Sequence, residues 1–237
     1  MSVFPTAYFL HAGYTESLFL ALTIASFYYA REDRWLLSGL FGMLASATRI
    51  TGIFLVPALL IEYLSQKEFR IKNLKLNFLY LGLIPIGFIA YLVINYITFE
   101  NAFAFLEIQR GHWFKTPALP WKGLLGTWGS IWGRDPGGRI LVGWAELIFG
   151  LFGLVGTIWV FIRFRISYGV YMLLTWITIT STSFWLSIPR YTLSMFPLFI
   201  ILAVVGRWAV IHYAITIISL SFYSFFLILF TQGRWAF

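Results

Sequence analysis

The sequence predicts an all-α fold, a polytopic bundle of transmembrane helices. Of the 237 residues, 60% are hydrophobic, 21% are aromatic and only 11% are charged, with a mean hydropathy of +0.82. Soluble domains carry about 25% charged residues, so this composition is typical of a chain whose surface faces lipid. The apolar stretch from Phe4 to Leu64 nevertheless contains Glu16 and Arg49. Ionisable side chains are expensive at membrane depth unless they face protein, water or substrate, so this pair predicts a polar cavity.

The apolar residues fall into about eight runs, each of which we interpret as a membrane pass. A helix needs about 20 residues to cross a hydrocarbon core of ~30 Å, and the second and third runs are shorter than that. They form either one long helix kinked near Gly52 or a hairpin of two short helices with Arg49 at its tip. The predicted passes are residues 15–30, 36–47, 53–64, 78–99, 141–162, 168–188, 193–206 and 209–230.

The positions of the basic residues favour the hairpin. Cytoplasmic loops of membrane proteins carry an excess of Lys and Arg. With a hairpin over residues 36–64, the basic clusters lie on one side, whereas a single helix would divide them between the two faces. These clusters contain Arg31, Arg34, Lys67, Arg70, Lys72, Lys75, Arg163, Arg165 and Arg207. Residues 1–237 are then a single transmembrane domain with an external loop at about residues 100–140. Within it, residues 121–132 predict an interfacial helix with Trp anchors.

Several function classes find no support in the composition. The chain has 17 Lys and Arg against 9 acidic residues, but the basic residues are scattered singly, whereas nucleic-acid binding needs a dense basic face. There is no Cys, and the three His residues show no metal-ligand spacing. The sequence contains no phosphate-binding P-loop and no dinucleotide fingerprint. We therefore expect neither nucleic acid nor a cofactor as a partner.

Glu16 and Arg49 are the first candidate site residues, and each has a structural alternative. Thr15 and Glu16 suit a helix start, where Glu16 would stabilise the positive end of the helix dipole, or it would line a substrate cavity. Arg49 lies among small residues that permit close helix approach. It would form an ion pair, for example with Glu16, or its planar guanidinium would hold a phosphate.

Two further segments carry candidate residues. In the external loop, residues 107–113 (EIQRGHW) combine amide, charged and aromatic groups of the kind that bind sugars, although aromatic residues also gather at membrane interfaces. Pro189 disfavours a continuous helix, so Arg190 lies at a helix start, where a cation opposes the dipole and an anionic partner is favoured. Glu146 lies near the start of its predicted helix, where we expect it to interact with the helix dipole.

These segments together resemble the PIG-V-like mannosyltransferase family, which includes the second mannosyltransferase of GPI-anchor assembly. The resemblance extends over the whole chain in the same order, and it is most specific in Tyr14-Thr15-Glu16-Ser17 and at residues 49–52. The segments that carry it are FPTAYFLHAGYTESLFLAL, ATRITGIFL, QRGHWF and IPRYTLSMFPLF.

The resemblance implies a GT-C type enzyme in a multi-pass membrane, the cell membrane or, in a eukaryote, that of the endoplasmic reticulum. Such enzymes take a sugar from a polyprenyl phosphate on the external or lumenal side. The positions that match the family pattern are Tyr14, Glu16, Arg49, Gln109, Arg110, Trp113, Arg190 and Tyr191. The family has earlier membrane helices and an external acidic residue, commonly after Trp, that acts as base. We expect this chain to correspond to the central and C-terminal part of such an enzyme.

The expected activity is transfer of a hexose, mannose by resemblance, from the polyprenyl-phosphate donor to a hydroxyl of a lipid or glycan acceptor. Arg49 and Arg190 would hold the phosphate as its negative charge grows, and Tyr14 with residues 109–113 would contact sugar or acceptor. Glu16 would orient an Arg or act as base, and no metal is required because the phosphate already activates the sugar. The alternatives are a transporter or flippase and an inactive protein that binds lipid-linked sugar.

Overall fold

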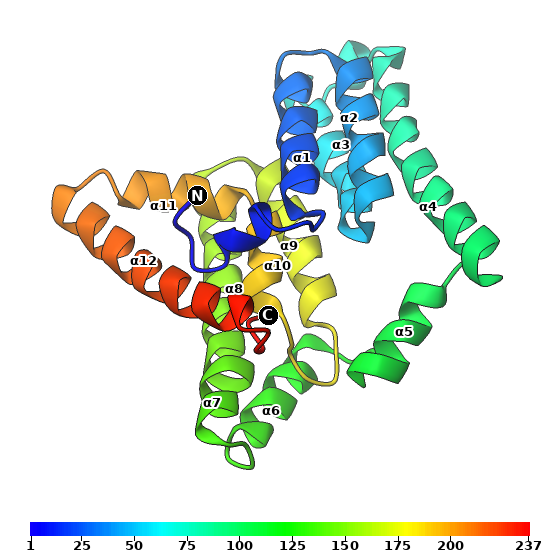
Figure 1. Ribbon diagram of the computed structural model, residues 1–237. Helices are drawn as coiled ribbons and strands as arrows, with labels where there is room; N and C mark the ends of the chain where they lie inside the picture. The colour runs from blue at the N-terminus through cyan, green and yellow to red at the C-terminus, as the bar shows by residue number, and fades with distance from the viewer. The chain divides into compact units, whose positions relative to one another are not determined.

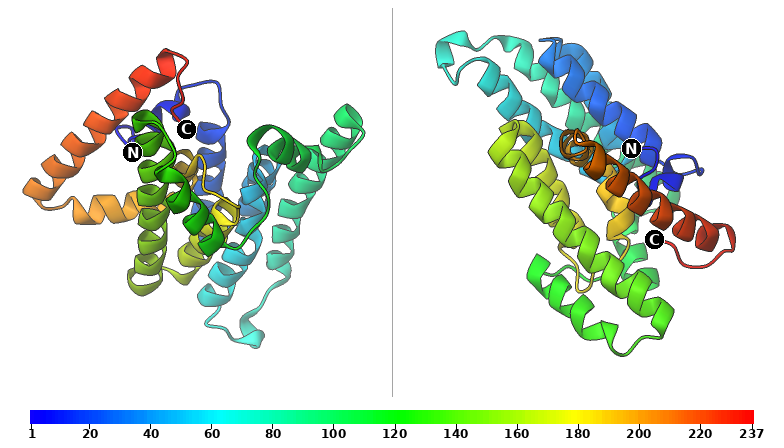
Figure 2. Two further views of the ribbon diagram at one scale, coloured as in Figure 1. Left: turned by 90° about the horizontal axis from the view of Figure 1, so that it is seen from below. Right: turned by 90° about the vertical axis from the view of Figure 1, so that its left-hand side faces the viewer.

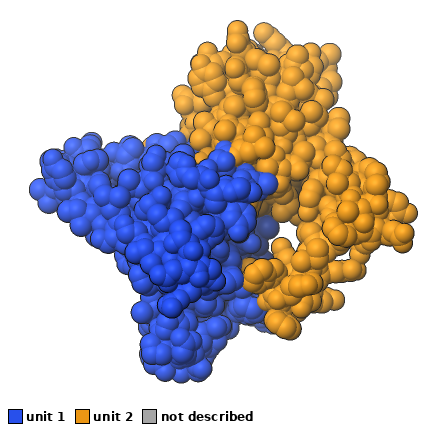
Figure 3. Space-filling model, in the orientation of Figure 1, with its two compact units in different colours: residues 1–17, 117–160, 176–237 blue, residues 18–116, 161–175 orange. Residues whose placement is uncertain are grey.

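The computed structural model describes the backbone of residues 1–237 and every side chain except that of Ile71. The described residues form helices and connecting segments and no β-strand, so the predicted all-α fold is confirmed. The chain forms two compact units (Figure 3). Unit 1 comprises residues 1–17, 117–160 and 176–237, and unit 2 comprises residues 18–116 and 161–175.

Unit 2 contains the first helices of the chain (Figure 1). Helix α2 packs along α4, and Gly87 makes this possible, because a Cβ there would meet the Met43 carbonyl oxygen and the Ser46 hydroxyl. The elements are α1 (Glu16–Arg31, whose first two residues belong to unit 1), α2 (Trp35–Thr48), η2 (Ile50–Phe54), α3 (Leu55–Gln66), η3 (Ile71–Asn73), η4 (Leu76–Gly82), α4 (Leu83–Phe99) and α5 (Ala104–Trp113), with the first part of α9 (Ile166–Thr180).

Helices α2 and α3 form the predicted hairpin. The chain leaves α2 at Arg49 in an extended conformation and turns through η2 before α3 begins. At the open end of the hairpin, the rings of Trp35 and Tyr63 lie edge to face with their centroids 4.8 Å apart. A ring contact between the start of α2 and the end of α3 requires the two helices to run antiparallel, which excludes a single kinked helix.

Unit 1 is built around α8 (Figures 1 and 2). Gly150, Gly153 and Gly156 lie on one face of α8, where the rings of Trp185 and Trp176 and the Leu198 side chain come close. Helices α11 and α12 form a V that closes at the turn before α12. The elements are η1 (Ala7–Leu10), α6 (Pro120–Ile131), α7 (Pro136–Arg139), η5 (Ile140–Trp144), α8 (Ala145–Arg163), α10 (Ile188–Tyr191), η6 (Thr192–Ser194), α11 (Pro197–Val205) and α12 (Ala209–Thr231), with the end of α9 (Ile166–Thr180).

The predicted pass over residues 168–188 is wrong in its second half, because α9 ends at Thr180. The following segment instead makes hydrogen bonds of its own. The Trp185 N–H donates to the Thr127 hydroxyl on α6 (2.7 Å), and its indole N–H donates to the Thr180 carbonyl (3.1 Å). The first bond satisfies a backbone N–H that a longer helix would have satisfied internally, the second satisfies the indole N–H, and Trp185 is almost completely buried.

Three helical segments of the described chain are long and apolar enough to cross a membrane: residues 76–99, 136–163 and 209–231. A fourth is counted if residues 188–194 and 197–205, which meet at 89°, form one broken span. The predicted helix over residues 121–132 is present as α6. By their length and composition these segments indicate a helical membrane protein, and the eight predicted passes are not confirmed.

Candidate functional site

The candidate site is built around Arg190, on the short helix α10 of unit 1. Ser187 precedes α10 in a left-handed conformation (φ 67°), and Pro189 occupies the first turn, where its missing N–H costs little. The Glu146 carboxylate on α8 accepts the backbone N–H groups of Ser187 and Ile188, both at 2.7 Å. The orientation of α10 is thus fixed by a buried carboxylate at its N-terminal end.

The Arg190 guanidinium makes three contacts within unit 1. Its Nε–H donates to the Glu16 Oε1 at 2.6 Å, and the Glu16 side chain is only 4% exposed. The guanidinium carbon lies 4.3 Å from the ring centroid of Tyr14 and 4.5 Å from that of Phe9. Cations are attracted to the faces of aromatic rings at such distances. The carboxylate and the two rings together hold the positive charge in one place.

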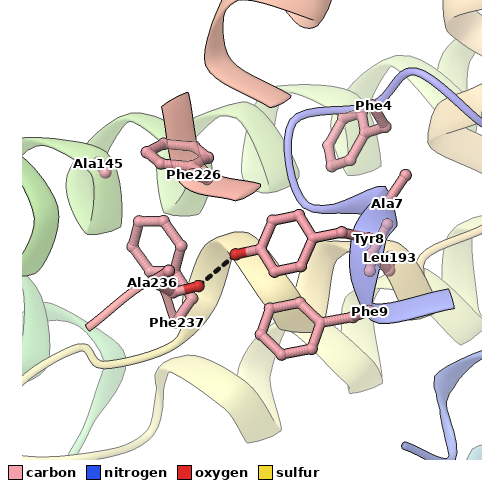
Figure 4. Packing of buried hydrophobic residues seen from close by; sticks show 9 residues of the cluster. All are labelled: Phe4, Ala7, Tyr8, Phe9, Ala145, Leu193, Phe226, Ala236 and Phe237. Atoms are coloured by element: carbon pink, nitrogen blue, oxygen red, sulfur yellow. Dashed lines mark hydrogen bonds between the residues drawn. The ribbon is translucent and has the colours of Figure 1, made fainter. Parts of the chain in front are cut away.

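The N-terminal segment that supplies these contacts is itself anchored to unit 1. The Thr6 hydroxyl donates to the Pro189 carbonyl at 2.9 Å, and Thr192 donates to the same carbonyl at 2.7 Å. Tyr8 donates to the Ala236 carbonyl in a cluster of buried apolar side chains, which Figure 4 shows. Burial raises the pKa of the Tyr8 hydroxyl, so it remains a neutral donor. The cluster comprises Phe4, Ala7, Tyr8, Phe9, Ala145, Leu193, Phe226, Ala236 and Phe237.

This arrangement suits an anion. Arg190 is 21% exposed, which leaves part of its guanidinium open to a ligand. Its Nε–H is used by Glu16, and among the described residues its terminal amino groups have no hydrogen-bond partner. The planar fork of an arginine matches the oxygens of a carboxylate or phosphate. Tyr14, whose ring lies against this cation, is about half exposed, and Tyr191 follows Arg190 in the sequence of α10.

The other predicted site residues belong to unit 2. Arg49 caps the end of α2, and its guanidinium carbon lies 6.0 Å from the Phe19 ring. Gln109, Arg110 and Trp113 are exposed on α5. The structure thus brings Tyr14, Glu16 and Arg190 together, while the convergence of Arg49 and the α5 residues on them stays a prediction. Among the described residues, no three His, Cys, Asp or Glu side chains gather in a group that could hold a metal ion.

Two contributors to the site were not expected from the sequence. Phe9 carries no polar group, and a single apolar residue in an apolar segment gives no signal of a cation contact. Glu146 lies in the first turn of α8, as expected, but the helical segment as a whole begins at Pro136, and the bonds from the Ser187 and Ile188 N–H groups to its carboxylate were not expected. Asp135 caps that N-terminus by accepting the Gly137 and Gly138 N–H groups. A carboxylate inside an apolar helix was the signal for a buried partner of another kind.

No family model, curated protein or solved structure matches the chain.

Proposed function

We propose that this protein is a membrane glycosyltransferase that moves a hexose, mannose by its family resemblance, from a polyprenyl phosphate to a hydroxyl of a lipid or glycan acceptor. The observation that carries the proposal is the Arg190 cation, paired with Glu16 and stacked on Phe9 and Tyr14. Its surroundings combine a positive charge with aromatic faces, which suit the phosphate and the sugar of such a donor. The long apolar helices are of the kind that cross a membrane, and the lipid chain of the donor would lie in that membrane.

In the proposed reaction the acceptor oxygen attacks the anomeric carbon and inverts it. The bond from that carbon to the phosphate oxygen breaks, and the phosphate leaves with the electron pair. Arg190 donates to the phosphate oxygens as their charge grows, and Arg49 is the second cation proposed there. Fixed donors that meet developing charge in this way are among the strongest contributors to catalysis. Tyr14 and Tyr191 are proposed to contact the sugar.

The acceptor must also lose a proton to a base. Unit 1 contains three carboxylates, Glu16, Asp135 and Glu146, and each accepts hydrogen bonds. A carboxylate paired with a guanidinium is stabilised in its charged form and is a weak base. We therefore assign Glu16 the role of holding Arg190, and it acts as a base only in a state where that pair opens.

Because each of these carboxylates already accepts hydrogen bonds, none is an obvious base. This favours a second candidate function, the binding of a lipid-linked sugar without turnover. The cation and the aromatic rings that would recognise the donor are the same in both cases. The two functions differ only in whether a base reaches the acceptor hydroxyl, so binding and transfer must be measured separately.

The proposed fold is of the GT-C type with about eight passes, in a cell membrane or the membrane of the endoplasmic reticulum. In this proposal the hairpin of α2 and α3 enters the bilayer as a pair of short helices. The helix α5 then lies on the external side, where Gln109, Arg110 and Trp113 contact the acceptor or sugar. Amide and guanidinium groups donate to hydroxyls, and the Trp ring stacks on the apolar face of a sugar.

The test incubates membranes that contain the full chain with polyprenyl-phosphate mannose and a lipid or glycan acceptor. Donor binding and sugar transfer are followed in parallel. We expect Arg190→Ala and Arg49→Ala each to lower transfer by roughly 100-fold, as for removal of one oxyanion donor. The matched control is Arg165→Ala, because Arg165 also pairs with a buried carboxylate, that of Glu62, at 2.8 Å.

Transfer that is unchanged in both Arg190→Ala and Arg49→Ala refutes the phosphate roles. Donor binding that depends on Arg190 but is followed by no transfer supports the second candidate. A loss that is equally large in Arg165→Ala would show that the assay reports folding and not the site.

A further inference from the structure

Glu146 is a completely buried carboxylate for which the proposed reaction has no use. It lies on α8, inside an apolar helical segment, and its exposed fraction is 0%. A buried charge is costly unless hydrogen bonds stabilise it. Its oxygens accept the backbone N–H groups of Ser187 (Oε1) and Ile188 (Oε2), each at 2.7 Å. These are short, charge-assisted bonds.

Both of these N–H groups stand at the N-terminal end of α10. The first N–H groups of a helix have no partner inside it, and α10 has only four residues. The residue before it, Ser187, is left-handed and its side chain makes no capping bond. Glu146 therefore supplies the cap from a distant part of the sequence, 41 residues from Ser187 and 42 from Ile188.

Arg190 follows the second capped residue by two positions, so the cap fixes the backbone from which the guanidinium extends. On the other side, Pro189 is held through its carbonyl by the Thr6 and Thr192 hydroxyls. The guanidinium must reach the Glu16 oxygen at 2.6 Å and lie near two ring faces at once. A small rotation of α10 would break these contacts together.

We propose that Glu146 is a positioning residue for Arg190, and through it for the phosphate of a lipid-linked substrate. This inference rests on the proposed function for its ligand, but the positioning itself concerns only residues of unit 1. Glu146 does not touch the anion. It sets the geometry in which Arg190 meets Glu16, Phe9, Tyr14 and the substrate phosphate.

The first measurement follows the Arg190 Nε–H by NMR in full-length protein with ¹⁵N-labelled arginine in detergent micelles, assigned by its loss in Arg190→Met. We expect Glu146→Gln to shift this signal, because a Gln side chain offers one acceptor oxygen for two N–H groups. The matched control is Glu62→Gln, which removes an equally buried carboxylate from unit 2 and should leave the signal in place. Glu146→Asp keeps the charge, and it provides a milder variant with a smaller shift if Glu146→Gln does not fold.

The second measurement is the Kd for polyprenyl phosphate in the same micelles. We expect Glu146→Gln to raise this Kd roughly tenfold, which corresponds to the loss of one charge-assisted hydrogen bond. In an Arg190→Met background, Glu146→Gln should raise it no further, because a positioning residue acts only through the residue that it positions.

The inference is overturned if the Arg190 signal does not move in the Glu146 variants, or if Glu146→Gln weakens binding equally in both backgrounds. If the signal moves but the unaltered protein does not bind polyprenyl phosphate, the positioning of Arg190 by Glu146 is supported and the proposed function is wrong. The two failures are thus distinguishable.

Discussion

Replacing Glu16 with Gln should destabilise unit 1 by removing the partner of the Arg190 cation. At an effective dielectric constant of about 20, two charges ~4 Å apart attract by about 4 kcal/mol. Desolvation offsets part of this attraction. The two side chains are 4% and 21% exposed, which places the pair between surface ion pairs, worth about 0–1 kcal/mol, and fully buried ones, whose disruption costs about 3–5 kcal/mol. We expect a coupling free energy of about 2 kcal/mol.

The assay is a double-mutant cycle in mixed micelles. The free energy of unfolding is measured by titration with SDS for the parent protein, Glu16→Gln, Arg190→Met and the double variant. Arg190→Met also removes the contacts with Phe9 and Tyr14, but these contacts are lost in both variants that carry the substitution and cancel from the coupling. The cycle therefore isolates the interaction between residues 16 and 190.

The pair Glu62–Arg165 in unit 2 provides the comparison. Its carboxylate is 1% exposed, as deeply buried as that of Glu16, but its guanidinium is 44% exposed. If the burial of the cation sets the magnitude of the coupling free energy, the cycle with Glu62→Gln and Arg165→Met should give a smaller coupling than the cycle with Glu16→Gln and Arg190→Met. A coupling for Glu16–Arg190 below about 0.5 kcal/mol, or one smaller than that of Glu62–Arg165, would contradict the reasoning.

Most helices could be predicted from the sequence because apolar runs between basic residues, Gly and Pro mark them directly. The run over residues 15–30 became α1, and the run over residues 209–230 became α12. The part of the helix that was predicted to continue beyond Thr180 is absent for a different reason. Residues 181–188 contain Phe, Trp, Leu and Ile and were included in a predicted pass, but α9 ends at Thr180 and the Trp185 N–H donates to Thr127 on α6. Such tertiary hydrogen bonds leave no trace in hydropathy.

The two charged residues of the Arg190 pair were singled out from the sequence, but their pairing was not predicted. Glu16 and Arg190 stand out because charges at the ends of apolar runs need partners, yet 174 positions separate them in the chain. Pairing Glu16 with Arg49 was equally consistent with the sequence. The roles of Phe9 and Glu146 depend on where α10 lies, and a local pattern cannot report the position of a four-residue helix.

Three further predictions concern packing and pH. Gly87→Ala should cost about 1–3 kcal/mol of unfolding free energy, because its Cβ meets the α2 backbone, whereas Gly82→Ala, with no atom within 4 Å of its Cβ, should be close to neutral. Gly150→Ala should be destabilising in the same assay, because the Trp185 ring that its Cβ meets is almost completely buried. The third concerns Asp33, whose pKa is lowered from 3.8 chiefly by the hydrogen bond from the Trp35 indole N–H at 2.6 Å. A lowered folded-state pKa means that the unfolded chain binds the proton more tightly, so this stabilisation is present above the ordinary pKa and is lost as the pH falls through the folded value. Asp33→Asn should therefore be less stable than the parent at pH 7, and this difference should be smaller at about pH 2, because the stabilisation is lost as the pH falls below the ordinary pKa of the carboxyl. Thermal unfolding in micelles at the two pH values measures this difference, and a gap that persists unchanged in acid would mean that the Asp33 charge is not its source.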